Sequence, residues 1–124
     1  MNRRRRKKLQ QRLTQAAGWA DAERVVALMR AGADPNTPGQ GRTTPLYCAS
    51  VQNQVDNLRV LLAAGADPNT ESGTGEERLP LCGAACWGHI EAIRELLTAG
   101  ADPNLREDNG SGRTAAQWAE AGDY

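Results

Sequence analysis

The sequence contains one five-residue phrase three times. Gly-Ala-Asp-Pro-Asn begins at Gly32, at Gly65 and at Gly100, with spacings of 33 and 35 residues. Identity over five positions at a nearly constant period indicates one supersecondary unit repeated along the chain. Units of this kind stack into a solenoid, whose long concave surface favours binding over catalysis.

Apolar residues recur in the same register within each unit. Positions separated by three and four residues lie on one face of a helix, so the second helix of each unit carries an apolar stripe. The repeated glycine suits the left-handed residue that ends such a helix, and Asp-Pro-Asn is turn chemistry. The stripe consists of Val25, Leu28 and Met29, then Leu58, Leu61 and Leu62, then Ile93, Leu96 and Leu97.

The first helix of two units is predicted to begin at Thr-Pro or Leu-Pro, since proline is tolerated in the first helical turn. The segments TPLYCAS (44–50) and LPLCGAACWGH (79–89), with the triple Gly-Ala-Asp-Pro-Asn, resemble ankyrin repeats. This resemblance covers roughly residues 9–124 and implies paired antiparallel helices in a stack, with hairpin-like fingers between repeats. Tyr47 and Cys82 depart from the family pattern, because a histidine usually stands at the helix start.

The resemblance predicts an all-α fold, an ankyrin-repeat solenoid of stacked helix-turn-helix units. We divide the chain into a basic N-terminal arm (residues 1–8) and a repeat domain (9–124). The units of this domain are 9–36, 37–69, 70–104 and 105–124, and the last provides a first helix from Thr114 to about Ala121 but no second helix. Three to four units are near the minimum for a stable stack.

A protein partner is expected in the concave groove, which in this family is formed by the fingers and the first helices. Register places Trp19, Gln52 and Trp87 near the ends of successive first helices, and Trp and Arg are enriched at binding hot spots. The alternative is that the two tryptophans only cover their helix ends, and we expect Trp118 to pack partly against the third unit. The candidate partner-binding residues are Trp19, Arg42, Thr43, Gln52, Arg78, Cys86, Trp87 and Arg113.

The fingers span residues 37–43 (finger one), 70–78 (finger two) and 105–113 (finger three). The two longer fingers either extend the binding wall or form solvated loops, and Asn109-Gly110 favours a tight hairpin turn. At the C-terminal end, the missing second helix predicts an apolar strip on Ile90, Ile93 and Leu97, open to a partner or to a second copy unless residues 114–121 cover it.

Cys82, Cys86 and His89 have helical spacing, but a structural zinc site normally needs four ligands and no fourth is evident. A Cys-His nucleophilic pair lacks a third, orienting group. We therefore expect structural roles for these residues, no metal, no cofactor and no enzymatic activity. A small-molecule enzyme built around Cys86, Trp87 and His89 is the weakest alternative.

The charge distribution is asymmetric although the formal net charge is zero. Seven of the 15 basic residues lie within residues 1–12, which contain none of the 15 acidic residues. The basic arm is either a flexible tail or a polyanion-binding segment for nucleic acid, and cations at a helix N-terminus are expected to make it fray unless an anion neutralises them. The arm residues are Arg3, Arg4, Arg5, Arg6, Lys7 and Lys8.

No apolar run approaches the ~18 residues that span a membrane, and no apolar stretch follows the basic N-terminus as in a secretory signal. The three cysteines have no disulfide-framework spacing, which favours a reducing compartment. The leading hypothesis is a cytoplasmic, non-enzymatic adaptor or inhibitor that binds a protein partner through its groove. Polyanion or nucleic-acid binding through the arm is the alternative.

Overall fold

The computed structural model describes residues 2–73, 78–107 and 112–122. Within these ranges the regular structure is helical and no strand occurs. The first helices of successive units are α1 (Arg3–Trp19), α3 (Pro45–Val51), α5 (Pro80–Cys86) and α8 (Ala115–Ala121). The second helices are α2 (Ala22–Arg30), α4 (Val55–Ala63) and α6 (Ile90–Thr98), and a short 3₁₀ helix, η1, spans Gln40–Arg42 in finger one.

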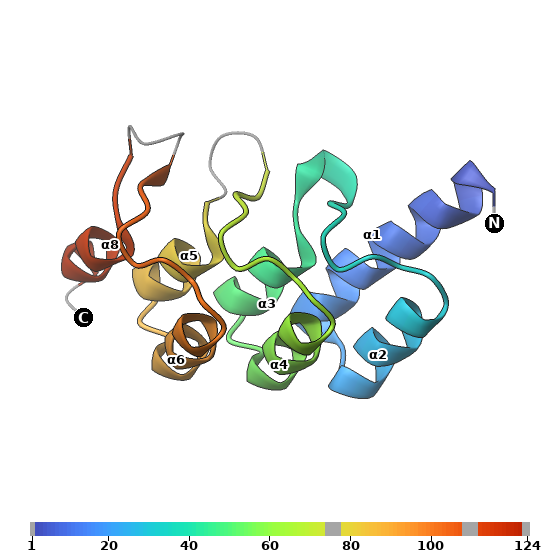
Figure 1. Cartoon of the computed structure of the whole chain (residues 1–124), viewed down its shortest axis with the longest axis horizontal. Coiled ribbons are helices and arrows are strands. Elements are labelled where there is room, and N and C mark those ends of the chain that lie inside the picture. Colours follow the sequence, from blue (N-terminus) through green and yellow to red (C-terminus); the bar gives the residue numbers. More distant parts are fainter. Residues whose placement is uncertain (1, 74–77, 108–111, 123–124) are drawn as a thin grey trace.

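The helices form two layers, as Figure 1 shows. The first helices lie side by side in one layer, and the second helices form the layer beside it. The fingers project from the side of the first helices, and the two chain ends lie at opposite ends of the stack. This arrangement confirms the predicted all-α stack of helix-turn-helix units.

The repeated glycine ends each second helix in the way the sequence predicts. Gly32, Gly65 and Gly100 all have positive φ, at 119°, 97° and 98°. The residue after each glycine donates its N–H to a carbonyl one turn back, as in Ala66 to Leu61 (3.0 Å), which is the hydrogen bond of a Schellman motif. An added Cβ at Gly65 or Gly100 meets no atom within 4 Å, so backbone conformation is what favours glycine there.

The apolar stripe forms the core between the layers. Val25, Leu58, Leu61 and Leu96 are fully buried, and alanines of the first helices, such as Ala49, fill the narrow space opposite them. Small residues also let neighbouring first helices approach closely, as at Gly83 of α5, which lies against α3. A Cβ there would lie 2.9 Å from both Tyr47 Cε2 and Val51 Cγ2 of the preceding unit.

Asparagine side chains connect the bases of successive units. Asn36 donates through Nδ2 to Gly65 O (2.8 Å) and accepts from Asp67 N (2.7 Å). Asn69 makes the same two bonds one unit later, to Gly100 O (3.2 Å) and from Asp102 N (2.8 Å). The last residue of the repeated phrase is therefore the link between units as well as part of a turn.

Two other side chains cap the first helix of the preceding unit. Asn57 is buried in α4 and donates through Nδ2 to Ala17 O and Ala20 O, both at 2.9 Å, at the C-terminal end of α1. The His89 Nε2 atom lies 3.0 Å from Val51 O at the end of α3. Carbonyls at helix ends have no partner within the helix, so these contacts satisfy them and join the layers.

The basic arm is continuous with the first helix, so the boundary expected at residue 8 falls inside α1. Helix α1 begins at Arg3, and the Asn2 side chain accepts the N–H of Arg5 at 2.9 Å as an N-cap. Cations are unfavourable at a helix N-terminus. Three features offset this cost: the Asn2 cap, the high helix propensity of arginine and lysine, and the buried residues in the later turns of α1.

The other first helices begin as predicted. Thr44 caps α3 through its hydroxyl, Leu79 provides no side-chain cap for α5, and Thr114 caps α8 with Gln117 in a reciprocal capping box. The fingers are closed at their bases by backbone bonds, such as Ser72 N to Arg78 O (3.2 Å), without a strand in the described residues. The predicted turn at Asn109-Gly110 lies outside the described residues.

Adjacent leucines of α6 provide a matched test of this packing. Leu96 is fully buried and Leu97 is 42% exposed. We predict that Leu96→Ala lowers the free energy of unfolding by about 2–5 kcal/mol, because it removes buried volume between two units. Leu97→Ala should cost much less. Urea unfolding followed by circular dichroism measures both, and equal effects at the two positions would contradict the assigned register.

Candidate functional site

The two tryptophans of the predicted groove are exposed at equivalent positions. Trp19 is the last residue of α1, Gln52 is the C-cap of α3, and Trp87 is the C-cap of α5. The exposed fractions of Trp19 and Trp87 are 77% and 60%, which are the two largest aromatic exposures among the described residues. Cys86 precedes Trp87 and is half-buried.

Trp19 faces the N-terminal end of the stack as well as the row of helix ends. It lines a shallow cavity of about 500 Å³ with Arg12, Gln15 and Arg24, together with two alanines. On its side toward α3, the end of α1 contacts Gln52, whose Cγ is 3.4 Å from the position a Cβ would take at Gly18. The surface around Trp19 therefore combines an apolar ring with amide and guanidinium groups.

The predicted residues on the finger side do not join this row. Seven residues of α3 separate Thr44 from Gln52, and at about 1.5 Å per residue this places the two ends roughly 10 Å apart. Arg42 in η1 is exposed and Thr43 is half-buried. The residues proposed as one groove thus occupy two parallel edges of the first-helix layer.

Arg78 does not project from the stack, contrary to the expectation for a partner-binding arginine. Its guanidinium carbon lies 4.0 Å from the ring centroid of Trp118, and its Nε is 3.4 Å from Glu107 Oε2. Arg113 lies 4.8 Å from the same ring centroid. Stacking on an aromatic face and pairing with a largely buried carboxylate hold Arg78 between the third and fourth units. Trp118 packs against the third unit as predicted.

Glu107 is the residue of this cluster that the sequence analysis missed. It lies in finger three, is only 5% exposed and accepts a hydrogen bond from Trp118 Nε1 at 3.0 Å. The signal that points to it is register. Ser72 stands 35 residues earlier, is 2% exposed, and accepts from Thr44 N at 2.9 Å. The third position of fingers two and three therefore faces inward.

Cys82 and His89 contact opposite neighbours, so they do not form one site. His89 reaches back to Val51 of the second unit, whereas Cys82 Sγ lies 3.9 Å from Arg113 O of the fourth unit. Burial, reinforced by the negative charge of Glu107, raises the pKa of the Cys82 thiol to about 12. The thiolate is the nucleophilic form, so Cys82 is inert at neutral pH. No cluster of three or more potential metal ligands occurs in the described ranges.

The six cationic residues of the arm occupy the first two turns of α1, and all are exposed. Three of them, Arg3, Arg6 and Lys7, line a cleft together with Arg42 of finger one. The sequence analysis assigned Arg42 to the protein-binding groove, but the structure places it beside the basic arm. No ion pair joins these four residues to an acidic side chain in the part of the chain that is described.

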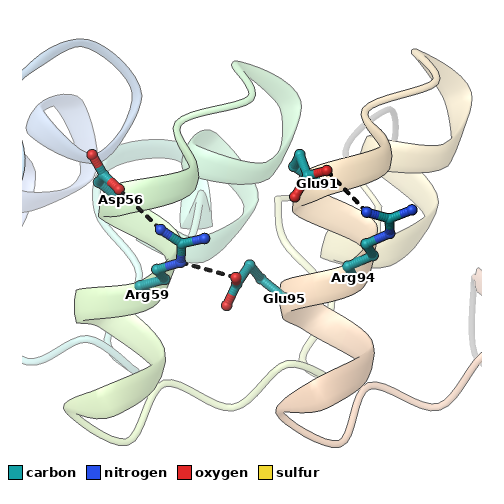
Figure 2. A network of polar contacts seen from close by, with 5 residues as sticks. All are labelled: Asp56, Arg59, Glu91, Arg94 and Glu95. Carbon is teal, nitrogen blue, oxygen red and sulfur yellow. Dashed lines mark hydrogen bonds and ion pairs between the residues drawn. The ribbon is translucent and has the colours of Figure 1, made fainter.

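Ion pairs differ between the middle and the C-terminal end of the layer of second helices. Figure 2 shows Arg59 between Asp56 and Glu95, with contacts of 3.3 and 2.9 Å, so that it joins α4 to α6. Arg94 is equivalent to Arg59 by register, but it pairs with Glu91 of its own helix at 3.1 Å. No further second helix follows α6 in the described residues, and Ile90 is 61% exposed there.

The comparison with known protein families agrees with this architecture. A family model described as ankyrin repeats (3 copies) matches residues 13–107, which is more than half of the chain. The chain belongs to the ankyrin repeat family. Ankyrin repeats are generally protein–protein interaction modules and are typically non-enzymatic. No curated protein matches the chain. No helix in the described residues is long and apolar enough to cross a membrane.

The position of Arg78 leads to a test of stability. We predict that Arg78→Ala lowers the free energy of unfolding by about 1–3 kcal/mol, because it uncovers Trp118 and removes the cation beside a buried carboxylate. Arg94→Ala is the control, since Arg94 pairs only with an exposed glutamate of its own helix. Thermal unfolding measures both variants, and an unchanged midpoint for Arg78→Ala would show that the cluster contributes nothing to stability.

Proposed function

We propose that this ankyrin repeat protein is a non-enzymatic adaptor or inhibitor that binds one protein partner through the row of first-helix ends. The observation that carries this proposal is the exposure of Trp19 and Trp87 at equivalent positions of the stack. Exposed tryptophans are costly in water and are enriched at binding hot spots. Gln52 lies between them in register and contributes a hydrogen-bonding amide.

The surroundings of the row support this assignment. Arg12 and Arg24 flank Trp19, so the partner surface combines an apolar contact with groups that bind carboxylates. The cysteines Cys48, Cys82 and Cys86 are free, which supports a reducing, cytoplasmic location. Arg78 and Arg113 are left out of the proposed surface because they stack on Trp118.

The test compares an exposed tryptophan with a packed one. We predict that Trp87→Ala reduces recovery of the partner by roughly tenfold or more, with an unchanged melting temperature. Trp118→Ala should lower the melting temperature, since Trp118 packs on the third unit. Affinity capture from cells that express the protein, followed by mass spectrometry, identifies and quantifies the partner. A fall in stability without a loss of capture for Trp87→Ala would show that Trp87 only covers its helix end.

A second candidate function is polyanion binding by Arg3–Lys8. It is favoured by the exposure of all six side chains and by the lack of ion pairs to them among the described residues. Salt dependence separates the two functions, because contacts to phosphates weaken steeply as salt rises and an apolar tryptophan contact does not.

We also propose that the outer face of α6 takes part in self-association. Ile90 is 61% and Leu97 is 42% exposed on this face, and α8 packs against α5 instead of covering it. We predict a weight-average mass that rises with concentration in light scattering, and Ile90→Glu should abolish this rise. Glu91→Ala is the control on the same turn. A constant monomeric mass at all concentrations would reject the proposal.

A further inference from the structure

The cleft between α1 and finger one has the composition of an anion site. It encloses about 880 Å³ and is lined by Arg3, Arg6 and Lys7 on one side and by the Thr37–Arg42 segment on the other. Small-molecule sites have volumes of about 300–1,000 Å³. The cleft is therefore large enough for a compact ligand, and it is distinct from the row of exposed tryptophans.

The cationic side of the cleft is one face of a helix. Arg3, Arg6, Lys7 and Gln10 are spaced at i, i+3, i+4 and i+7, so they project from the same side of α1. They extend over about 10 Å at a rise of about 1.5 Å per residue. Several adjacent anionic groups can thus be contacted at once, and Arg42 closes the site from finger one.

The wall formed by finger one is held firmly against this helix. Gln10 donates through Nε2 to Asp34 O and to Thr37 O, both at 2.6 Å, and accepts from Asp34 N at 2.9 Å. Gly39 approaches so closely that a Cβ there would lie 2.7 Å from Thr14 Oγ1. Because these contacts fix finger one on α1, the two segments that carry the four cations are held side by side before any ligand binds.

The charge balance of the lining is strongly positive. Asp34 is the acidic residue in the cleft, and its Oδ1 accepts the N–H of Asn36 at 2.8 Å. The four cations have no acidic partner in the described part of the chain, and three of them crowd the N-terminal turns of α1, where positive charge is unfavourable. An anion in the cleft would relieve this repulsion.

The lining also defines the chemistry of the ligand. It contains the side-chain amides of Gln11 and Gln40 but no aromatic side chain, so a base has no surface on which to stack. We propose that this cleft binds a compact, multiply phosphorylated anion. This inference rests on the second candidate function, polyanion binding by the arm, and narrows it to one face of α1 together with Arg42.

Inorganic tripolyphosphate is the probe, and isothermal titration calorimetry of the full chain is the measurement. We expect saturable binding with one site, which weakens as salt is raised. The double variant Arg6→Gln/Arg42→Gln should weaken binding by roughly tenfold or more. The control is Arg4→Gln/Arg5→Gln, which removes the same number of charges, both from the first turns of α1 and from residues that do not line the cleft. It should change affinity by less than about threefold.

A variant that is expected to strengthen binding provides a further test. Asp34→Asn keeps an oxygen that can accept from Asn36 N, but it removes the negative charge from the cleft. Tripolyphosphate should then bind about twofold to fivefold more tightly. Circular dichroism of each variant verifies that the fold is retained, and tripolyphosphate should raise the thermal midpoint of the unmodified protein.

Three outcomes would overturn the inference, and they separate it from the broader function. Equal losses in the two double variants would mean that the arm binds anions without the cleft. Binding of an oligouridylate but not of tripolyphosphate would assign the arm to nucleic acid instead. No binding of either probe at low salt would reject both the cleft and the second candidate function.

Discussion

No unit of this chain can bury its apolar stripe alone, and the rest of the structure follows from this constraint. Leu58, Leu61 and Leu96 are fully buried because helices of the same unit and of its neighbours cover them. The stability of a stack is therefore shared between units, and its ends are special. At the C-terminal end the face that a further second helix would cover carries Ile90 and Leu97, which remain exposed.

Polar contacts set the spacing that this burial requires. Asn36 and Asn69 each bind the backbone of the next unit, and Gln10 takes the corresponding place at the first turn of the stack. The Asn104 amide has no such partner within the described residues, since no following glycine turn is present there. Side-chain amide hydrogen bonds thus join successive units, and Gln10 makes such bonds at the N-terminal end of the stack. The cationic cleft is a product of this end, because Gln10 holds finger one against α1.

Much of the fold could be predicted from sequence patterns that span a few residues. The period of the repeated phrase predicts the length of the unit, and the glycines predict the helix ends. The apolar stripes predict the buried residues Leu28, Leu61 and Leu96, whereas Leu97 in the same stripe is 42% exposed. The exposure of Trp19 and Trp87 also followed from register. Residue type alone placed charged side chains poorly. Arg78 was expected at the partner-binding surface and Glu107 was not singled out, whereas both lie against Trp118.

The sequence by itself determined the repeating unit, because helix periodicity and turn chemistry act over a few residues and recur unchanged. Only the tertiary structure decided which charges meet. Arg42 and Arg6 line one cleft, and Arg78 lies beside Glu107 in one cluster, although the members of these pairs are 36 and 29 residues apart in the sequence. Such neighbours depend on how one unit is placed on the next and on where long side chains reach. The placement of one unit on the next and the conformations of long side chains are set by packing between the units. A pattern that spans only a few residues does not contain this information.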